Sequence, residues 1–313
     1  MASSAEAAPP AAGSRSARAG PWLLILAAFC FAAMAVLVKK CTASGFDKTA
    51  LLTERFALGA AVLWAWILIG RDRIRLGRGE LLALLGPGAA GYCVMAFCYF
   101  TSVQRLPAST AALLLYTYPP LTAVLSARFG GEQVGARQWI AIALAVGGVA
   151  LVLEGAHAGT PGQTALDPLG VACALCAAAV YAGYLVLCSR KLRNVPPRLS
   201  SAVVASAAST VFAGIAIVRG APWSPAEPAG WGWLGLLVLL STVIGMQAFF
   251  AGARRTAPSR AAVLGTAEPV FAVALSAVTL GESLTLAQVA GGIVIIAAVL
   301  LSRKAESVST HRD

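Results

Sequence analysis

Glu268 is the side chain whose position in the sequence points most directly to chemistry. It lies inside a long apolar run, directly before Pro269, and eight residues after Arg260, which is about 12 Å along a helix. An ionised carboxylate in the centre of a bilayer costs several kcal/mol unless it is paired or hydrated. We therefore expect Glu268 to face protein or water, where it binds a substrate amine, carries a coupled proton, or bonds backbone groups that the proline leaves open.

Two prolines at corresponding places predict breaks in apolar helices. Pro119 and Pro269 are 150 residues apart, each about halfway along an apolar run. Proline lacks a backbone N–H and leaves carbonyls of the preceding turn without their helical partner. Membrane helices tolerate such carbonyls where they face protein or a wet cavity. Each kink therefore either fixes helix packing alone or also lines a solute path.

Further polar groups within apolar runs are candidates for solute contact. Aromatic rings that carry hydroxyls, with one amide, would suit an amphiphilic cavity for amino-acid-like or heteroaromatic solutes, although each taken singly is more often a packing residue. These candidates are Tyr99, Tyr116, Tyr118, Tyr184 and Gln247.

Arg55 falls near one end of an expected helix at residues 50–70. Its guanidinium either attracts a substrate carboxylate at a cavity mouth or snorkels to the membrane interface, as long basic side chains do.

The sequence offers little support for nucleotide binding or for enzymatic catalysis. Gly86, Gly88 and Gly91 match G-x-G-x-x-G, but they lie in an apolar run with no preceding strand, so a nucleotide site is not expected. An intramembrane enzyme would need a nucleophile, base or metal ligands at depth, and the two histidines, His157 and His311, fall in a loop and a tail. We expect no cofactor, no metal and no enzymatic activity.

The elements that must position these residues are membrane helices. The chain has 313 residues, 58% of them hydrophobic and 12% charged, whereas soluble domains carry about 25% charged residues. A membrane-spanning helix needs roughly 20 apolar residues. The apolar runs predict ten such helices, at residues 21–38, 50–70, 81–104, 106–127, 138–153, 168–189, 199–218, 228–253, 261–280 and 284–302.

The distribution of positive charge predicts the orientation. Eighteen Lys and Arg residues fall around one set of alternate connections and the termini, and six fall around the other set. Lys and Arg are concentrated on the cytoplasmic side of membrane proteins, so both termini are expected there. The net charge of +11 is spread over short clusters, which suits an anionic lipid surface and not nucleic acid.

The second half of the sequence repeats the first. Residues 100–151 align without a gap with residues 250–301, and 15 of the 52 pairs are identical, including Ser109 with Ser259 and Glu132 with Glu282. Five helices per repeat is an odd number, so the repeats must cross the membrane in opposite directions, as is typical of secondary transporters. We expect a disordered tail at 1–20, repeats at 21–154 and 168–302, and a second tail at 303–313.

Two hairpin segments resemble the drug/metabolite transporter superfamily and, within it, the EamA-like transporter family. They read YTYPPLTAVLSARFGGEQVGARQWIAIALAVGGVALVL and GTAEPVFAVALSAVTLGESLTLAQVAGGIVIIAAVLL. The resemblance implies ten helices, a central cavity between the repeats, a plasma (inner) membrane location and outward movement of metabolites such as amino acids.

The sequence thus predicts an all-α polytopic membrane protein that acts as a secondary transporter of a small-molecule substrate, coupled to protons or another gradient. The alternatives are a membrane receptor or scaffold, and an uptake permease of the same fold.

Overall fold

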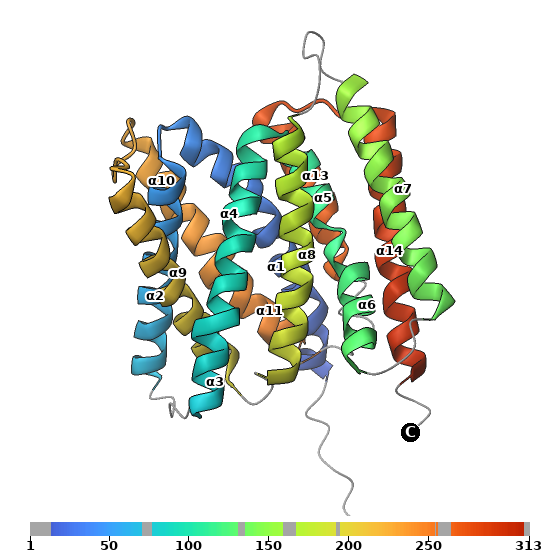
Figure 1. Cartoon of the computed structure of the whole chain (residues 1–313), viewed down its shortest axis with the longest axis horizontal. Coiled ribbons are helices and arrows are strands. Elements are labelled where there is room, and N and C mark those ends of the chain that lie inside the picture. The colour runs from blue at the N-terminus through green and yellow to red at the C-terminus, as the bar shows by residue number, and fades with distance from the viewer. Residues whose placement is uncertain are drawn as a thin grey trace, which may run out of the picture.

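The computed structural model describes residues 14–70, 77–130, 135–158, 167–191, 195–253, 255 and 264–309. This part of the chain is helical and contains no β-strand (Figure 1). Its elements are α1 (Ser14–Ala43), α2 (Lys48–Ile69), α3 (Arg78–Ala83), the π-helix η1 (Leu84–Gly88), α4 (Ala89–Arg105), α5 (Ala108–Leu115), α6 (Tyr118–Gly130), α7 (Ala136–Ala158), α8 (Pro168–Lys191), α9 (Pro197–Val218), α10 (Ala229–Leu237), the π-helix η2 (Val238–Ile244), α11 (Gly245–Ala253), α13 (Ala267–Leu280) and α14 (Leu286–Ser309).

These helices form the predicted series of apolar segments. Eight segments within the described residues are long and apolar enough to cross a membrane, and two shorter apolar helices follow at Ala267–Leu280 and Leu286–Leu301. Their outer faces carry large hydrophobic side chains, among them Val218 (88% exposed) and Leu286 (85% exposed). An apolar surface of this extent indicates contact with lipid. The prediction of an all-helical, polytopic membrane protein is confirmed.

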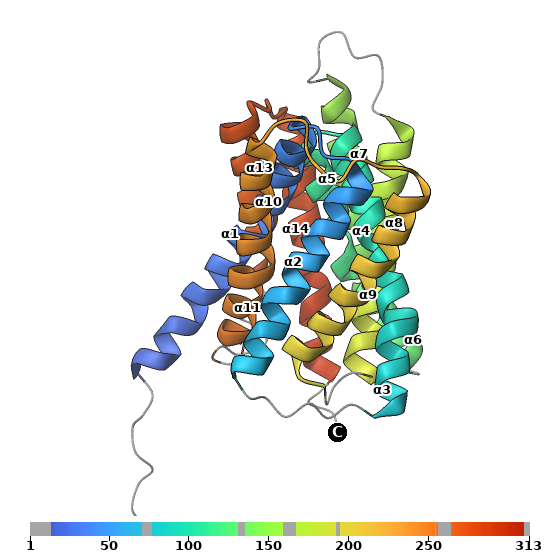
Figure 2. The same ribbon diagram turned by 90° about the vertical axis from the view of Figure 1, so that its left-hand side faces the viewer.

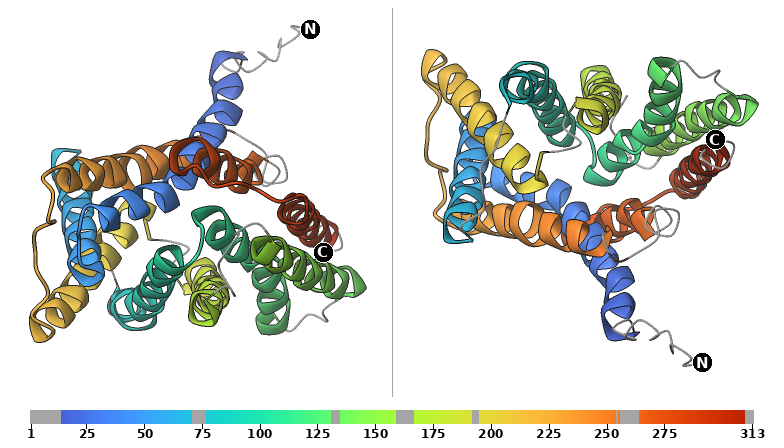
Figure 3. Two further views of the ribbon diagram at one scale, coloured as in Figure 1. Left: turned by 90° about the horizontal axis from the view of Figure 1, so that it is seen from above. Right: turned by 90° about the horizontal axis from the view of Figure 1, so that it is seen from below.

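The packing of the helices follows the sequence repeat. Helix α2 packs on α9 and α7 packs on α14, and in each pair the partner is the helix five segments later. The remaining large contacts also correspond between the halves. The third segment, α4, packs on the sixth, α8, and the eighth, α11, packs on the first, α1. Likewise the fourth segment, α5 with α6, packs on α8, and the ninth, α13, packs on α1. Figure 3, viewed along the helices, shows α4, α8 and α5 on one side and α10, α11 and α13 on the other. This pattern is that of two similar halves related by an approximate two-fold axis.

The halves run in opposite directions. The α1–α2, α9–α10 and α13–α14 connections lie at the upper end of the bundle in Figure 1, whereas α2 and α8 end, and α3 and α9 begin, at the lower end. We call the upper end the Glu282 end, because Glu282 lies in the α13–α14 connection. Helix α1 starts at the lower end and crosses the bundle obliquely, which Figure 2 shows most clearly.

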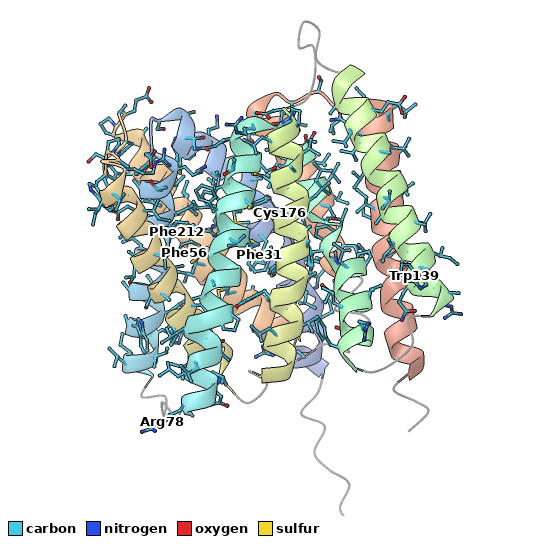
Figure 4. All side chains as sticks on the ribbon, viewed as in Figure 1. Phe31, Phe56, Arg78, Trp139, Cys176 and Phe212 are labelled. Atoms are coloured by element: carbon cyan, nitrogen blue, oxygen red, sulfur yellow. The ribbon has the colours of Figure 1, made fainter. Side chains whose placement is uncertain are left out.

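Two features of the pairs explain their close contact. Between α7 and α14, a Cβ built on Gly291 would lie 2.6 Å from the Gly148 carbonyl oxygen, so only glycine permits this approach. Between α2 and α9, the rings of Phe56 and Phe212 lie side by side with centroids 5.9 Å apart (Figure 4).

The predicted ends of the first and last helices differ from the structure. Helix α1 begins at Ser14 and α14 continues to Ser309, so each extends beyond its apolar run into residues that we assigned to tails. Ala, Arg, Lys and Glu in those stretches are good helix formers, so each helix continues for a few polar turns beyond its apolar, membrane-spanning part. Residues 1–13 and 310–313 lie outside the described residues.

Candidate functional site

The fourth and ninth segments are both broken directly before their prolines. Helix α5 ends at Leu115 and α6 begins at Tyr118, so Pro119 is the second residue of the new helix. Helix α13 begins at Ala267 after a turn at Thr266, and Pro269 is its third residue. Broken helices that meet near mid-membrane are a recurring feature of solute sites in secondary transporters.

A hydrogen bond joins the two breaks. The Tyr116 hydroxyl donates to the backbone carbonyl of Gly265. Gly265 is four residues before Pro269, so its carbonyl is the one that would accept from that position in an uninterrupted helix, and proline has no N–H to donate. Tyr116 is 3% exposed. The sequence suggests Tyr116 as a solute contact. In the structure its hydroxyl donates a hydrogen bond to the backbone of the other repeat.

Five of the chain's six tyrosines form what we call the tyrosine cluster, built from α4, α8 and the break between α5 and α6. The ring centroids lie 5.7 Å apart for Tyr116 and Tyr118, 4.7 Å for Tyr118 and Tyr181, 6.2 Å for Tyr181 and Tyr184, and 5.5 Å for Tyr184 and Tyr92. Except for Tyr116, these side chains are only half-buried, although they lie inside the bundle. Four partly accessible tyrosine rings therefore lie beside the break in the fourth segment.

Glu268 belongs to the same region. It lies in the first turn of α13, where the partial positive charge of the helix N-terminus favours a carboxylate. It is half-buried and lies within electrostatic range of Tyr181 and of Tyr99, the sixth tyrosine. Tyr118 occupies the equivalent place in the first turn of α6. The structure thus brings together Glu268, Tyr99, Tyr116, Tyr118 and Tyr184, and it places Tyr92 and Tyr181 beside them.

Gln247 is placed differently from the tyrosine cluster. Its side-chain oxygen accepts a hydrogen bond of 3.3 Å from Arg198 Nε on α9, and its amide nitrogen is buried with no hydrogen-bond partner in the described part of the chain. Arg198 also lies over the ring of Trp66, 4.9 Å from the centroid. Gln247 therefore links α11 with the first turns of α9.

Arg55 is buried among helices α1, α2, α4 and the π-helix η2. Its residue is 7% exposed, so it does not snorkel to the interface. One guanidinium nitrogen lies 3.1 Å from Met34 Sδ and 3.5 Å from Ser241 Oγ. The rings of Phe56 and Phe100 each have their centroid 5.3 Å from the guanidinium carbon.

A group of polar contacts at the Glu282 end, which we call the Glu282 clamp, was not predicted. The Glu282 carboxylate accepts from the backbone N–H groups of Ala108 (2.6 Å) and Ser109 (3.0 Å), accepts from the Ser109 hydroxyl (2.6 Å), and pairs with Lys39 (3.3 Å). Glu282 thereby caps α5, a helix of the other repeat. Gly281 does end α13, with φ +66°. Glu132, its counterpart in the sequence repeat, lies outside the described residues.

Burial opposes ionisation of Glu282, but the hydrogen bonds from Ser109 and Ala108 and the charge of Lys39 outweigh it, so its pKa lies below the usual value. The carboxylate is therefore charged at neutral pH and acts as a fixed anion at the N-terminus of α5.

Two hollows are outlined by described residues. One, of about 630 Å³, lies at the Glu282 end and is lined by Lys39, Lys40, Gln104 and Glu282 among others. The other, of about 350 Å³, is apolar and lies along α1 between Trp233 and Leu275. Neither is lined by Glu268 or the tyrosine cluster, so the central cavity that the family resemblance implied stays a prediction.

Fold and site together define a polytopic membrane protein of transporter type, with inverted repeats, two broken helices and a carboxylate beside them. The chain belongs to the EamA-like transporter family, whose model matches residues 18–154 and 168–303.

Relatives agree with this assignment. The uncharacterized transporter YcbK of Bacillus subtilis (strain 168) is 27% identical over 284 residues, which cover 88% of this chain and 90% of YcbK. The pseudopaline exporter CntI of Pseudomonas aeruginosa is 27% identical over 136 residues, which cover 43% of this chain and 46% of CntI. A protein of known crystal structure shares the fold, with a TM-score of 0.63 over 92% of this chain and 99% of that chain at 23% identity.

Proposed function

We propose that this transporter exports a small amphiphilic metabolite, such as an amino acid or a related solute, across the plasma membrane by alternating access. In this proposal both termini are cytoplasmic and the solute passes between the two repeats. A proton gradient is the proposed energy source, with Glu268 as the group that binds the solute or carries the proton.

The observation that carries the proposal is the meeting of two broken helices beside Glu268 and the tyrosine cluster. The broken ninth segment presents the N-terminus of α13 near mid-membrane, and the partial positive charge of such a terminus can bind a polar or anionic group of a solute. Tyrosine rings add apolar surface with hydroxyls at the edge, which suits solutes that are partly polar and partly apolar. The likeness to CntI over part of the chain favours export over uptake.

The direct test is solute flux in vesicles reconstituted with the purified protein, with and without a pH gradient. We expect saturable flux of at least one amino acid or related amphiphile, faster when the gradient drives protons against the exported solute. The absence of flux for a broad panel of metabolites would instead favour a receptor or scaffold.

Glu268→Gln tests the role of the carboxylate, because the amide keeps the size of the side chain but can neither carry a charge nor exchange a proton. We expect flux to fall at least tenfold while the variant is inserted and folded like the wild type. Glu154→Gln is the matched control, because Glu154 is exposed in the last turns of α7. Unchanged flux in Glu268→Gln would remove Glu268 from the mechanism.

A further inference from the structure

Arg55 is a buried cation whose hydrogen-bonding capacity is largely unused. Of the two ion pairs found within the described residues, neither involves Arg55. Its Nε is buried and has no hydrogen-bond partner among the described residues. Its hydrogen-bonding contacts within the described residues are the Met34 thioether at 3.1 Å, which is a weak acceptor by nature, and the Ser241 hydroxyl at 3.5 Å, which is long for a hydrogen bond.

Such an arrangement is costly for a purely structural residue. A charged side chain within the membrane is expensive unless a counter-charge or water compensates it, and arginine cannot discharge by losing its proton. The rings of Phe56 and Phe100 offer only part of the compensation, through cation–π attraction. In the part of the chain that the structure describes, the guanidinium is therefore held in place without an anionic partner within ion-pair distance.

The surrounding elements also favour a ligand. Ser241 lies in the π-helix η2, and its hydroxyl donates to the Leu237 carbonyl at 2.6 Å, which leaves its lone pairs directed to Arg55. Single π-helical turns in helices are frequent at functional sites. Tyr99 lies within electrostatic range of both Arg55 and Glu268, which connects Arg55 with the proposed solute path.

We propose that Arg55 is the subsite for the anionic group of the transported solute, and that this group is a carboxylate bound through Nε–H and the neighbouring guanidinium N–H. This inference rests on the proposed function and deepens it by naming the charge that the solute carries. The planar guanidinium edge matches a carboxylate with two parallel hydrogen bonds. The two phenylalanine rings hold the guanidinium in place, so the fork is oriented before the solute arrives.

The test is ligand-induced stabilisation of the purified full-length protein, since a ligand that binds the folded state raises the unfolding temperature. The probes are acetate, propionate and phenylacetate, each compared with its own amide, which has nearly the same shape and no charge. We expect at least one acid to raise the unfolding temperature of the wild type and its amide to have no effect. We expect Arg55→Gln to bind that acid at least tenfold more weakly.

Arg219→Gln is the matched control, because it removes an exposed arginine at the Glu282 end, and we expect it to retain the response to the acid. If Arg55→Gln cannot be purified, Arg55→Lys replaces it, because lysine keeps the charge but lacks the Nε–H and the planar fork. We expect Arg55→Lys also to bind the acid at least tenfold more weakly.

Three results would overturn the proposal. They are equal binding of acid and amide by the wild type, no response of the wild type to any of the three acids, and acid binding by the Arg55 variants as tight as that of the wild type. The flux assay described above is independent of these probes. Flux without acid binding would refute the Arg55 subsite and leave the transport function standing. Acid binding without flux of any metabolite would refute the transport function and leave Arg55 as a carboxylate-binding site.

Discussion

At the scale of residues, Tyr116 shows how a side chain suited to solute contact can be used by the backbone. Its hydroxyl bonds the Gly265 carbonyl that Pro269 leaves without a helical partner. The sequence identifies both Tyr116 and Pro269 as unusual groups in apolar runs. It cannot pair them, because they belong to different repeats and the pairing depends on how the repeats pack.

Tyr116→Phe removes this hydrogen bond and leaves the half-buried Gly265 carbonyl without this donor, which costs about 1–3 kcal/mol. We expect the variant to unfold at lower temperature or denaturant concentration in detergent. Tyr92→Phe is the comparison: no hydrogen bond of the Tyr92 hydroxyl is found among the described residues, and Tyr92 is only half-buried.

Pro269→Ala provides a test of the cause, because alanine restores an N–H that can bond Gly265 within the helix. In that background we expect Tyr116→Phe to cost less, with a coupling of about 1 kcal/mol in a double-mutant cycle. Additive costs would show that Tyr116 stabilises the protein for another reason.

At the scale of elements, the Glu282 clamp joins three segments that are far apart in the sequence. Glu282 comes from the α13–α14 connection, Lys39 from α1, and Ala108 and Ser109 from the start of α5. The first N–H groups of a helix have no partner within it. In α5 two of them are satisfied by an element of the other repeat, which closes the bundle at this end.

Glu282→Gln should weaken the clamp, because a neutral amide is a poorer acceptor and cannot pair with Lys39. We expect the free energy of unfolding to fall by about 2 kcal/mol, as for hydrogen bonds to charged groups. Glu227→Gln, an exposed glutamate at the same end, should change it little. A Glu282→Gln variant as stable as the wild type would mean that the clamp contributes nothing to stability.

The clamp should also respond to acid. The pKa of Glu282 lies below its usual value of 4.5 in the folded protein, so the unfolded chain takes up this proton first as the pH falls. The stabilisation is complete above about pH 4.5 and is lost as the pH drops through the folded-state pKa. The difference in unfolding free energy between wild type and Glu282→Gln should therefore be constant near neutral pH and shrink below pH 4.5. A difference that grows in acid would contradict this assignment.

At the scale of the whole molecule, much of the fold followed from the sequence. Apolar runs indicated the helices, because hydrophobicity is a local property of each run. The 150-residue repeat indicated that the two halves run in opposite directions, because each half holds an odd number of helices. The contacts inside the site were less accessible. Sequence placed Arg55 near the membrane surface by counting along its helix, but its burial depends on α1, α4 and η2, which no local pattern specifies.

The orientation is the prediction that concerns the entire molecule. We expect a cysteine at Ser224, exposed in the α9–α10 connection, to react in intact cells with a thiol reagent that cannot cross membranes. A cysteine at Gly79, exposed at the opposite end of the bundle, should react only after the membrane is permeabilised. The reverse labelling pattern would place both termini outside the cell.

The Glu282 clamp has a consequence for how the protein is made. Ala108 and Ser109 leave the ribosome long before Glu282, which follows them by more than 170 residues. Until the last hairpin has been inserted, the amide groups at the start of α5 must find water or a temporary partner. The nascent first half therefore cannot reach its final arrangement by itself, and a chain that stops before Gly281 should be recognised by membrane quality control and degraded.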